Sequence, residues 1–276
     1  MGAPADVHAW RPTVPGVVEV FHAHFTDHAY PMHVHDSWTL LIVDDGAVRY
    51  DLDRHEHGAL DSLVTLLPPY VPHNGRTATP HGFRKRVLYL EPARSGAGET
   101  GSTGSGRLGD RLIGAAVDAP SVADATLRRW ISQTHDAVAR PGDEFAAESR
   151  LALVLERLHR HLDRHLAYGV AASPSTARRL RDLIHARTVS GITLDEAAGI
   201  LHAHPTHLIR AFGREFGMSP HRYLMSLRVD LARRRLLAGH PIGTVAADSG
   251  FYDQPHLTRS FARIVGTSPG RFARAA

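Results

Sequence analysis

Three histidines in the first third of the chain have a spacing that could bind a metal or a small molecule. His33 and His35 lie two residues apart in HAYPMHVHDSW, so on a strand both side chains would point to one face. His73 follows in PPYVPHNG, near the end of another expected strand. Imidazole nitrogens are ligands for Zn²⁺, iron and nickel, and they also hydrogen-bond to organic ligands. The pattern leaves open a metal site, an effector pocket, or ordinary residues that hydrogen-bond to the backbone.

Two aromatic residues are candidates for an apolar wall beside these histidines, namely Trp38 and Tyr89. The order of the histidines resembles the metal pattern of cupin barrels, in which a glutamate follows the histidine pair. Here that position is Thr39. We therefore expect no metal and no cofactor, and the three histidines are the candidate ligands if a metal does bind.

Short β segments are expected to position these side chains. Residues 17–91 contain apolar or alternating runs of 7–9 residues, separated by turn formers such as Asn74-Gly75. The runs are VVEVFHAHF, WTLLIVDD, AVRYDLD, SLVTLLPP and RKRVLYLEP. This pattern is typical of a sandwich or small barrel, so residues 1–94 are expected to form a cupin-like effector-binding barrel. The stretch SGAGETGSTGSG, residues 95–106, has the composition of a flexible linker.

A helical segment is expected over residues 107–166. In ESRLALVLERLHRHLDRHL, leucines 151, 155, 158 and 162 recur at steps of three and four and form one apolar stripe. Such a stripe predicts a helix packed on its own domain or a dimerisation helix, and periodicity does not separate the two. The Gly- and Pro-containing stretch AYGVAASPS, residues 167–175, predicts a linker between domains.

The C-terminal hundred residues contain one motif twice. The first copy is ITLDEAAGILHAHPTHLIRAFGREFGMSPHRYL and the second is PIGTVAADSGFYDQPHLTRSFARIVGTSPGRFA. Each copy predicts a short helix, a tight connection and a second helix. A capping box is expected at Thr193 and Glu196 and a left-handed residue at Gly250. Helices joined in this way are typical of a helix-turn-helix, whose second helix fits the major groove of DNA.

The second helix of each copy has one apolar and one polar face. Leu208 and Phe212, like their counterparts in the second copy, recur at i, i+4 and are expected to face the core. The polar-face positions are Thr206, Ile209 and Arg210 in the first copy and Gln254, Thr258 and Arg259 in the second. Because arginine can pair with both acceptors of a guanine edge, Arg210 and Arg259 are the strongest candidates for contact with bases or phosphates.

The net charge of the C-terminal hundred residues differs in sign from that of the rest of the chain. Residues 174–276 hold fifteen Arg against seven Asp and Glu, a net charge of +8. The remainder holds seventeen basic and twenty-one acidic residues, a net charge of −4, and the two sum to the overall +4. A basic third attached to an acidic remainder indicates that one part of the chain binds a polyanion.

The repeated region resembles the DNA-binding domain of AraC/XylS-type transcription regulators. The strings DSGFYDQPHLTRSFARIVGTSPGRFA and GREFGMSPHRYL carry the resemblance, which covers residues 174–276. It implies seven helices with two helix-turn-helix units, joined by a long helix over about Pro220–Leu237. The histidine-containing N-terminal part is similar to the ligand-binding domains that precede such DNA-binding domains.

The resemblance also implies which residues contact DNA. They are Thr206, Ile209 and Arg210 in the first unit and Gln254, Pro255, Thr258 and Arg259 in the second. Two positions depart from the family pattern. His204 replaces the usual serine cap, which predicts a weaker helix start, and Pro255 replaces a small polar residue and donates no hydrogen bond.

We therefore expect a cytoplasmic transcription regulator that binds promoter DNA, responds to an unknown small-molecule effector and is not an enzyme. RNA polymerase is a further partner if the protein activates, and a homodimer is possible. The alternatives are a metal-dependent cupin enzyme fused to a DNA-binding domain, and a regulator whose barrel only dimerises.

Composition excludes several other classes. The chain has no cysteine, so the alkyl-transfer DNA repair chemistry of some proteins with a similar DNA-binding unit is excluded, because it needs a cysteine nucleophile. The sequence has no apolar run of eighteen residues, so no membrane partner is expected. The first residues do not have the pattern of a secretion signal.

Overall fold

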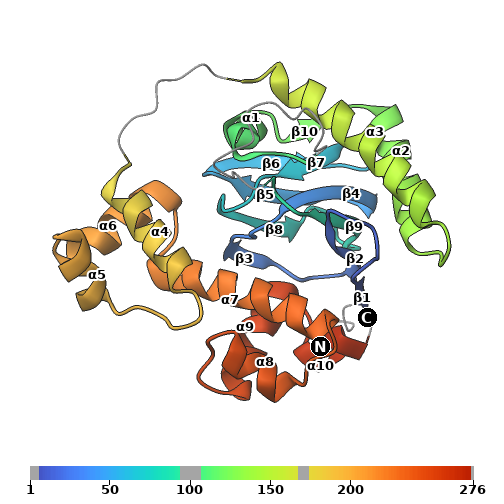
Figure 1. Cartoon of the computed structure of the whole chain (residues 1–276). Coiled ribbons are helices and arrows are strands. Elements are labelled where there is room, and N and C mark those ends of the chain that lie inside the picture. Colours follow the sequence, from blue (N-terminus) through green and yellow to red (C-terminus); the bar gives the residue numbers. More distant parts are fainter. Residues whose placement is uncertain (1–5, 94–106, 167–173, 275–276) are drawn as a thin grey trace.

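A computed structural model describes residues 6–93, 107–166 and 174–274 of the chain (Figure 1). It has an N-terminal domain of strands with helices on one side, and a C-terminal domain of helices. This confirms the predicted two-domain α+β fold. The predicted linkers at residues 95–106 and 167–175 lie outside the described residues, apart from residues 174 and 175.

Two antiparallel sheets build the N-terminal domain. The first sheet has the order β1-β2-β9-β4-β7-β10 and the second the order β3-β8-β5-β6. The strands of the first sheet are β1 (Asp6–Trp10), β2 (Val17–Phe25), β9 (Phe83–Leu90), β4 (Trp38–Gly46), β7 (Val64–Leu67) and β10 (Ser121–Val122). Those of the second are β3 (Tyr30–His33), β8 (His73–Thr77), β5 (Val48–Leu52) and β6 (His55–Ala59).

The five apolar runs of the sequence correspond to β2, β4, β5, β7 and β9, whereas the other strands were not predicted. Strand β8 shows why. Asn74-Gly75 was predicted to be a turn, but both residues lie inside β8. The side chain of Asn74 accepts a hydrogen bond from the backbone N–H of Asp51 on β5 at 2.7 Å and donates one to its carboxylate at 2.6 Å. Pairing with a neighbouring strand therefore overrides the local turn preference.

Alternate residues of the first sheet face two different cores, because successive side chains on a strand point to opposite faces. On β4, Leu41 and Val43 face the interior between the sheets. Leu40 and Ile42 face the covering helices. The interior between the sheets is continuous with the apolar core of the C-terminal domain, so the two domains share one buried core.

Three helices cover the outer face of the first sheet (Figure 1). They are α1 (Ile113–Asp118), which follows a 3₁₀ turn (Asp110–Leu112), α2 (Ala125–Val138) and α3 (Glu144–Asp163). The predicted leucine stripe of α3, at positions 151, 155, 158 and 162, is buried against its own domain. The stripe is therefore occupied within one chain, and a dimer stays a prediction.

Seven helices form the described part of the C-terminal domain, as the resemblance implied. They are α4 (Thr176–Ala186), α5 (Leu194–Leu201), α6 (Pro205–Phe216), α7 (Pro220–Leu237), α8 (Ile242–Asp248), α9 (Gln254–Val265) and α10 (Pro269–Arg274). The long connecting helix α7 has the predicted bounds. Thr193 and Glu196 form the expected capping box, and Gly250 has a φ of +80°. No helix in the described ranges combines the length and apolarity that a bilayer crossing needs.

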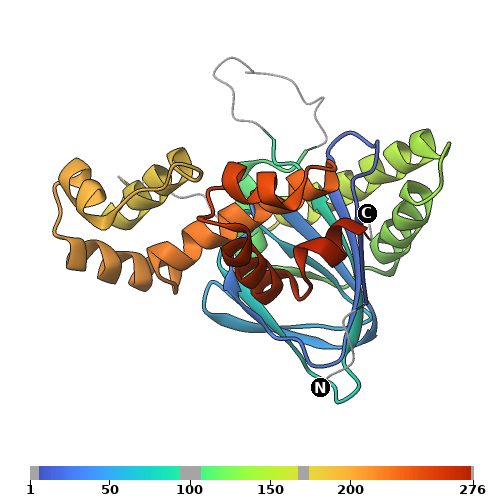
Figure 2. The same cartoon turned by 90° about the horizontal axis from the view of Figure 1, so that it is seen from below.

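The C-terminal domain packs against the N-terminal domain on one side. The first unit, α4–α6, projects away from the sheets, whereas α7 and the second unit, α8–α10, lie against them (Figure 2). Helices α7 and α9 contact β3, and α10 contacts β1. At Gly266, the left-handed cap of α9, an added Cβ would lie 2.6 Å from the ring of Phe25 on β2. The second unit therefore lies in close contact with the barrel.

Candidate functional site

The two predicted recognition helices, α6 and α9, begin with different caps. Asp253 precedes α9, and its carboxylate accepts the backbone N–H of His256 at 2.6 Å. His204 precedes α6, and its Nδ1 accepts the backbone N–H of Thr206 at 3.3 Å. The unusual histidine therefore still caps its helix, through a longer hydrogen bond. Pro255 lies in the first turn of α9, where its missing N–H has no partner to lose.

The predicted DNA-contacting side chains lie on the solvent side of both helices. Thr206, Ile209, Arg210, Gln254, Pro255 and Arg259 are exposed, and Thr258 is half-buried. Within the described ranges, no carboxylate lies within ion-pair distance of Arg210 or Arg259, so both guanidinium groups are free to meet an external anion. The apolar faces, with Leu208 and Phe212 in α6, are fully buried.

The two helix-turn-helix units contact each other at Gly250. A Cβ on this residue would lie 2.5 Å from the carbonyl oxygen of Val189, which belongs to the α4–α5 connection of the first unit. Arg228 of α7 lies at the same place, and its Nε donates to the carbonyl of Thr188 at 2.8 Å. The orientation of one unit relative to the other therefore depends on a position that tolerates only glycine.

A cavity of about 50 Å³ lies between the two sheets and the C-terminal domain. Its wall includes all three histidines and Tyr89 from the barrel. It also includes Arg233 of α7 and the side chains of Ile264 and Val265 at the end of α9. A molecule in this cavity would therefore contact both domains. Thr39 and Thr65 also line it, and both have a buried hydroxyl with no hydrogen-bond partner among the described residues.

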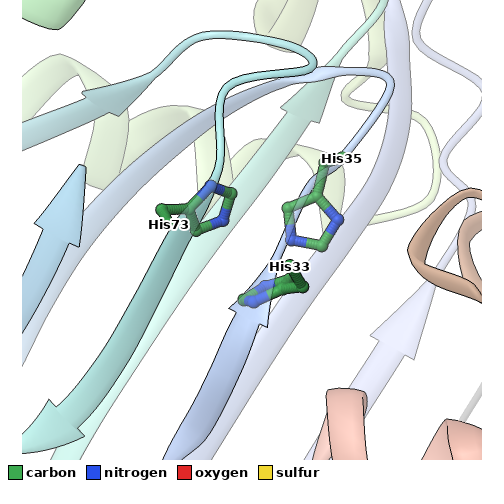
Figure 3. Close-up of side chains that lie close together, drawn as sticks. All are labelled: His33, His35 and His73. Atoms are coloured by element: carbon green, nitrogen blue, oxygen red, sulfur yellow. The ribbon is translucent and has the colours of Figure 1, made fainter. Parts of the chain in front are cut away.

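The three histidines converge on one point of this cavity (Figure 3). Their ring centroids are 4.4 Å apart for His33 and His73, 4.8 Å for His33 and His35, and 5.2 Å for His35 and His73. One nitrogen from each ring lies within 4.8 Å of the other two. His33 ends β3, His35 follows it, and His73 starts β8 rather than ending a strand as predicted. Pairing of β3 with β8 places His33 opposite His73.

Each ring is fixed through its Nδ1. Nδ1 of His33 lies 2.7 Å from the carbonyl oxygen of Pro31, and Nδ1 of His73 lies 3.0 Å from that of Val71. A carbonyl oxygen only accepts, so Nδ1 donates in both cases. Burial lowers the pKa of His33 and His35 well below the usual value and that of His73 to about 4. The three rings are therefore neutral near pH 7.

Two cations face the same cavity. Lys85 on β9 lies with its Nζ 4.2 Å from the centre of the Tyr30 ring, and no carboxylate in the described ranges lies within ion-pair distance of it. Burial lowers the pKa of Lys85 to about 7. Arg233 is 4% exposed, and its guanidinium lies 2.6 Å from Glu19 and stacks over Tyr89 at 4.4 Å. Arg233 is neutralised within the protein, whereas Lys85 is not.

Helix α7 is attached to the barrel at the cavity by charged groups. Oδ1 of Asp230 lies 2.9 Å from Nδ1 of His35, and its Oδ2 accepts the backbone N–H of Asp36 at 3.1 Å. Burial raises the pKa of Asp230 to about 6, so the group is largely ionised near pH 7 and Nδ1 of His35 is the donor. Arg234 adds an ion pair with Asp36. One turn of α7 thus contacts the segment that carries His35.

Comparison with known proteins identifies both halves of the chain. A family model described as an AraC-like ligand binding domain matches residues 15–155. A second, described as a helix-turn-helix domain, matches residues 197–275. The chain belongs to the AraC family. It is an AraC-type regulator with an N-terminal ligand-binding domain and a C-terminal helix-turn-helix domain.

Relatives of this AraC-family chain are themselves named as regulators. It is 39% identical over 72 residues to the HTH-type transcriptional regulator Rv1931c of Mycobacterium tuberculosis, a match that spans 26% of this chain and 28% of the relative. It is 21% identical over 234 residues to the uncharacterized HTH-type transcriptional regulator YbfI of Bacillus subtilis, spanning 83% of this chain and 81% of the relative. The chain thus spans less than a third of the length of the more similar relative.

Solved structures of ToxT from Vibrio cholerae have the same two-domain arrangement. One covers 100% of this chain and 99% of its own, with a TM-score of 0.57 and 10% sequence identity. Another, with unsaturated fatty acid bound, covers 98% and 94%, with a TM-score of 0.55 and 11% identity. At this identity the likeness shows the fold alone.

Four of the five predicted effector residues line the cavity, and Trp38 does not. The three histidines and Tyr89 are on its wall. Trp38 is fully buried in the core between the first sheet and its helices, where its Nε1 donates to the carbonyl of Leu108 at 3.0 Å. The placement of Trp38 on the pocket wall was therefore wrong, because this residue points to the other face of the sheet.

Three residues of the candidate sites were missed in the sequence. Lys85 is two residues before Val87 and four before Tyr89 on β9, so the alternation that places Tyr89 in the cavity also places Lys85 there. Arg233 lies in a run of three arginines, which gave no reason to single it out. Tyr252 precedes the cap of α9 and is 93% exposed beside the predicted recognition helix.

Proposed function

We propose that this chain is a sequence-specific transcription regulator that binds promoter DNA through α6 and α9 and is controlled by a small effector in the interdomain cavity. The observation that carries the proposal is the composition of the cavity wall. Residues of the barrel and of the DNA-binding domain line the same small space. A ligand bound there changes the contacts between the domains, and differential affinity for two domain arrangements is what regulation requires.

The geometry of the C-terminal domain supports binding to two adjacent major grooves. Helix α7 has 18 residues, which at 1.5 Å per residue gives a length of about 27 Å. It joins units that would insert α6 and α9 about 34 Å apart on one face of the duplex. Arg210 and Arg259 are exposed and unpaired within the described ranges, and we assign them the main base or phosphate contacts. The polar-face residues listed above, with Pro255, complete the two contact surfaces.

The side chains that line the cavity suit a compact effector with an anionic group. Lys85 has no carboxylate partner in the described ranges and provides the positive charge. Arg233 adds a guanidinium donor on the side of α7. Thr39 and Thr65 offer hydroxyl groups without partners. A fatty acid, bound to ToxT in one of its structures, is an example of an anionic ligand in a chain of this fold.

The size of the cavity bears on how effector binding affects the second recognition helix. The cavity is small, at about 50 Å³. We infer that a larger effector widens the space at Ile264 and Val265, which line the cavity on the side of the DNA-binding domain. These residues belong to α9, so effector binding shifts the second recognition helix relative to the barrel.

The same proposal includes four finer points. The protein acts in the cytoplasm, where promoter DNA is, and it has no catalytic step of its own. The outer face of α3, with Phe145 83% exposed, is the candidate dimer surface. If the protein activates, it contacts RNA polymerase while bound to its site.

Mapping of bound sites across the genome with the full-length chain tests the proposal. Binding to the sites found is then measured for Arg259→Ala and Arg210→Ala. Each substitution is expected to weaken binding by about 1–3 kcal/mol and to relax preference at one base pair. Arg49→Ala is the matched control, because Arg49 is also exposed but lies on β5 of the barrel.

Equal loss of affinity on all sequences would make Arg259 a phosphate contact. Affinity should also fall steeply with salt concentration, because bound arginines release counterions from the phosphates. Binding that is insensitive to salt, or that is weakened as much by Arg49→Ala as by Arg259→Ala, would contradict the proposed DNA surface.

A further inference from the structure

The three histidines of the cavity have the geometry of a metal site rather than of a purely organic pocket. All three are almost fully buried, at 4%, 5% and 4% exposure. One nitrogen of each ring lies within 4.8 Å of the others, and Figure 3 shows the rings gathered around one point. Nitrogens bound to one tetrahedral metal at 2.0–2.1 Å would be about 3.3 Å apart. Ring rotations that move each nitrogen by less than about 1 Å close that difference.

The second coordination sphere is already in place. Nδ1 of each ring is engaged by an acceptor, the carbonyls of Pro31 and Val71 for His33 and His73, and the carboxylate of Asp230 for His35. This fixes the tautomer, so each Nε2 carries the lone pair. No hydrogen bond to any Nε2 of the three occurs within the described ranges. Metal-binding histidines characteristically donate their other nitrogen to a carbonyl or carboxylate in this way.

We propose that His33, His35 and His73 bind one divalent transition metal ion, of which Zn²⁺ is the best match, through their three Nε2 atoms. Three neutral imidazoles at one point suit Zn²⁺ and its neighbours in the first transition series. A structural zinc site is closed by four protein ligands, whereas a site with three leaves one position open. Thr39, at the position where the cupin glutamate would be, does not close this site.

The open position faces the cavity, which gives the metal a role in recognising the effector. An anionic oxygen or nitrogen donor of the effector binds the metal directly while Lys85 contacts the rest of the anionic group. Direct binding of the effector to the metal rests on the proposed function, whereas binding of the metal by the three histidines does not. The ligand class is therefore narrowed to small molecules that carry a metal-binding anionic group.

The metal also connects the site to the DNA-binding domain. His35 donates to Asp230 of α7, which also accepts the backbone N–H of Asp36. A cation on Nε2 of His35 makes its Nδ1–H a stronger donor, which tightens the contact with α7. Asp230 is thus a positioning residue. It orients His35, and it makes the contact of His35 with α7 depend on whether the metal is bound.

Metal content of the full-length protein tests this inference. The chain is purified without a histidine tag, stripped with a chelator and dialysed, and Zn²⁺ or Co²⁺ is added back. We expect one ion bound per chain, and for Co²⁺ the visible absorption bands of a four-coordinate site. These measurements on the unmodified chain do not depend on whether a variant folds.

His73→Gln and His135→Gln form a matched pair for the same measurement. His135 is also almost fully buried, and its pKa is lowered by burial, but it lies on α2, away from the three histidines. We expect His135→Gln to retain the metal and its spectrum and His73→Gln to lose both. Asp230→Asn should weaken metal binding by about 10–100-fold while keeping one ion per chain at saturation, as expected for an outer-sphere partner.

Substoichiometric metal in the unmodified chain, or equal binding by His73→Gln and His135→Gln, would overturn the inference. Promoter binding is measured on the same samples before and after metal removal. Intact promoter binding without a stoichiometric metal refutes the metal site alone. Stoichiometric metal in a chain that binds no promoter refutes the proposed function instead.

Discussion

Lys85 is the residue whose chemistry distinguishes the cavity most clearly. It is the only lysine in the chain, and it faces aromatic rings with no carboxylate in ion-pair distance within the described ranges. Enclosing a cation without a partner costs folding free energy. A protein keeps such a residue where the charge serves function, and here an anionic effector would supply the missing partner.

Lys85→Met is therefore expected to stabilise the effector-free protein and to abolish the response to the effector. The gain should be about 1–2 kcal/mol near pH 6, at the low end of what replacement of buried ionic groups gives, because Lys85 is only half-buried by exposed area. Chemical denaturation of both proteins checks the gain, and a thermal-shift screen checks the response.

The difference in unfolding free energy between Lys85→Met and the wild type should shrink as the pH rises above about 7. Burial lowers the pKa of Lys85 from 10.5 to about 7. Below pH 7 the group is charged in the folded and unfolded states, so the full cost is present. Between about 7 and 10 the unfolded chain holds a proton that the folded chain has lost, so the stability of the wild type rises with pH. A stability difference that does not change with pH would show that burial does not lower the pKa of Lys85.

Residue identity and alternation predicted part of the cavity. His33, His35, His73 and Tyr89 reach the wall because their types and spacing were recognisable on short strands. Trp38 failed because an aromatic residue on a strand buried on both faces does not reveal which face it uses. Asp230 is invisible to this reasoning, since its partners lie about two hundred positions away along the chain.

At the scale of elements, the C-terminal helices were predictable and half of the strands were not. Helix α7 and both recognition helices begin at a side-chain cap followed by a proline in the first turn, and α6 and α9 have clear apolar periodicity, so their local signals agree with the final fold. Strands β6 and β8 are polar and short, HEHGA and HNGRT. They form because β5 pairs with both of them, and such non-local pairing leaves no local pattern.

The connection between the two DNA-binding units leads to a prediction for Gly250→Ala. Its φ of +80° costs an L-residue about 1–2 kcal/mol, and the new Cβ would lie 2.5 Å from the carbonyl of Val189. We expect a loss of stability of about 2 kcal/mol or more and weaker promoter binding, because the orientation of the two units changes. Thermal unfolding and promoter titration measure the two effects.

Gly199→Ala is the opposite case. Gly199 lies inside α5, and an added Cβ would meet nothing within 4 Å. Alanine should therefore stabilise the helix by about 0.5–1 kcal/mol and leave promoter affinity unchanged. If Gly250→Ala behaved like Gly199→Ala, the proposed dependence of the two units on this contact would be wrong.

At the scale of the whole molecule, one buried core and one set of charged contacts join the sensor to the DNA-binding domain. The apolar core runs from the barrel into the helices without a break. Helix α7 contacts the barrel through Asp230, Arg233 and Arg234, and Arg233 also lines the cavity. The proposed regulation requires this docked arrangement to be one of two states, whose equilibrium ligand and DNA can each shift.

If the effector changes the affinity for DNA, DNA must change the affinity for the effector to the same extent. This common factor is typically about 5–150-fold. Asp36→Asn should reduce that factor towards one, because it weakens the ion pair with Arg234 without removing a residue of the cavity or of the DNA surface. Arg235→Ala is the control, since Arg235 pairs with Asp248 inside its own domain.

Calorimetric titration of the effector with and without promoter DNA, and of DNA with and without effector, measures both factors in each variant. In the wild type we expect the change in promoter affinity to equal the change in effector affinity. Asp36→Asn should make both changes smaller, and Arg235→Ala should leave them unchanged. A factor of one in the wild type would mean that the barrel and the DNA-binding domain act independently, and the shared cavity would then have no regulatory role.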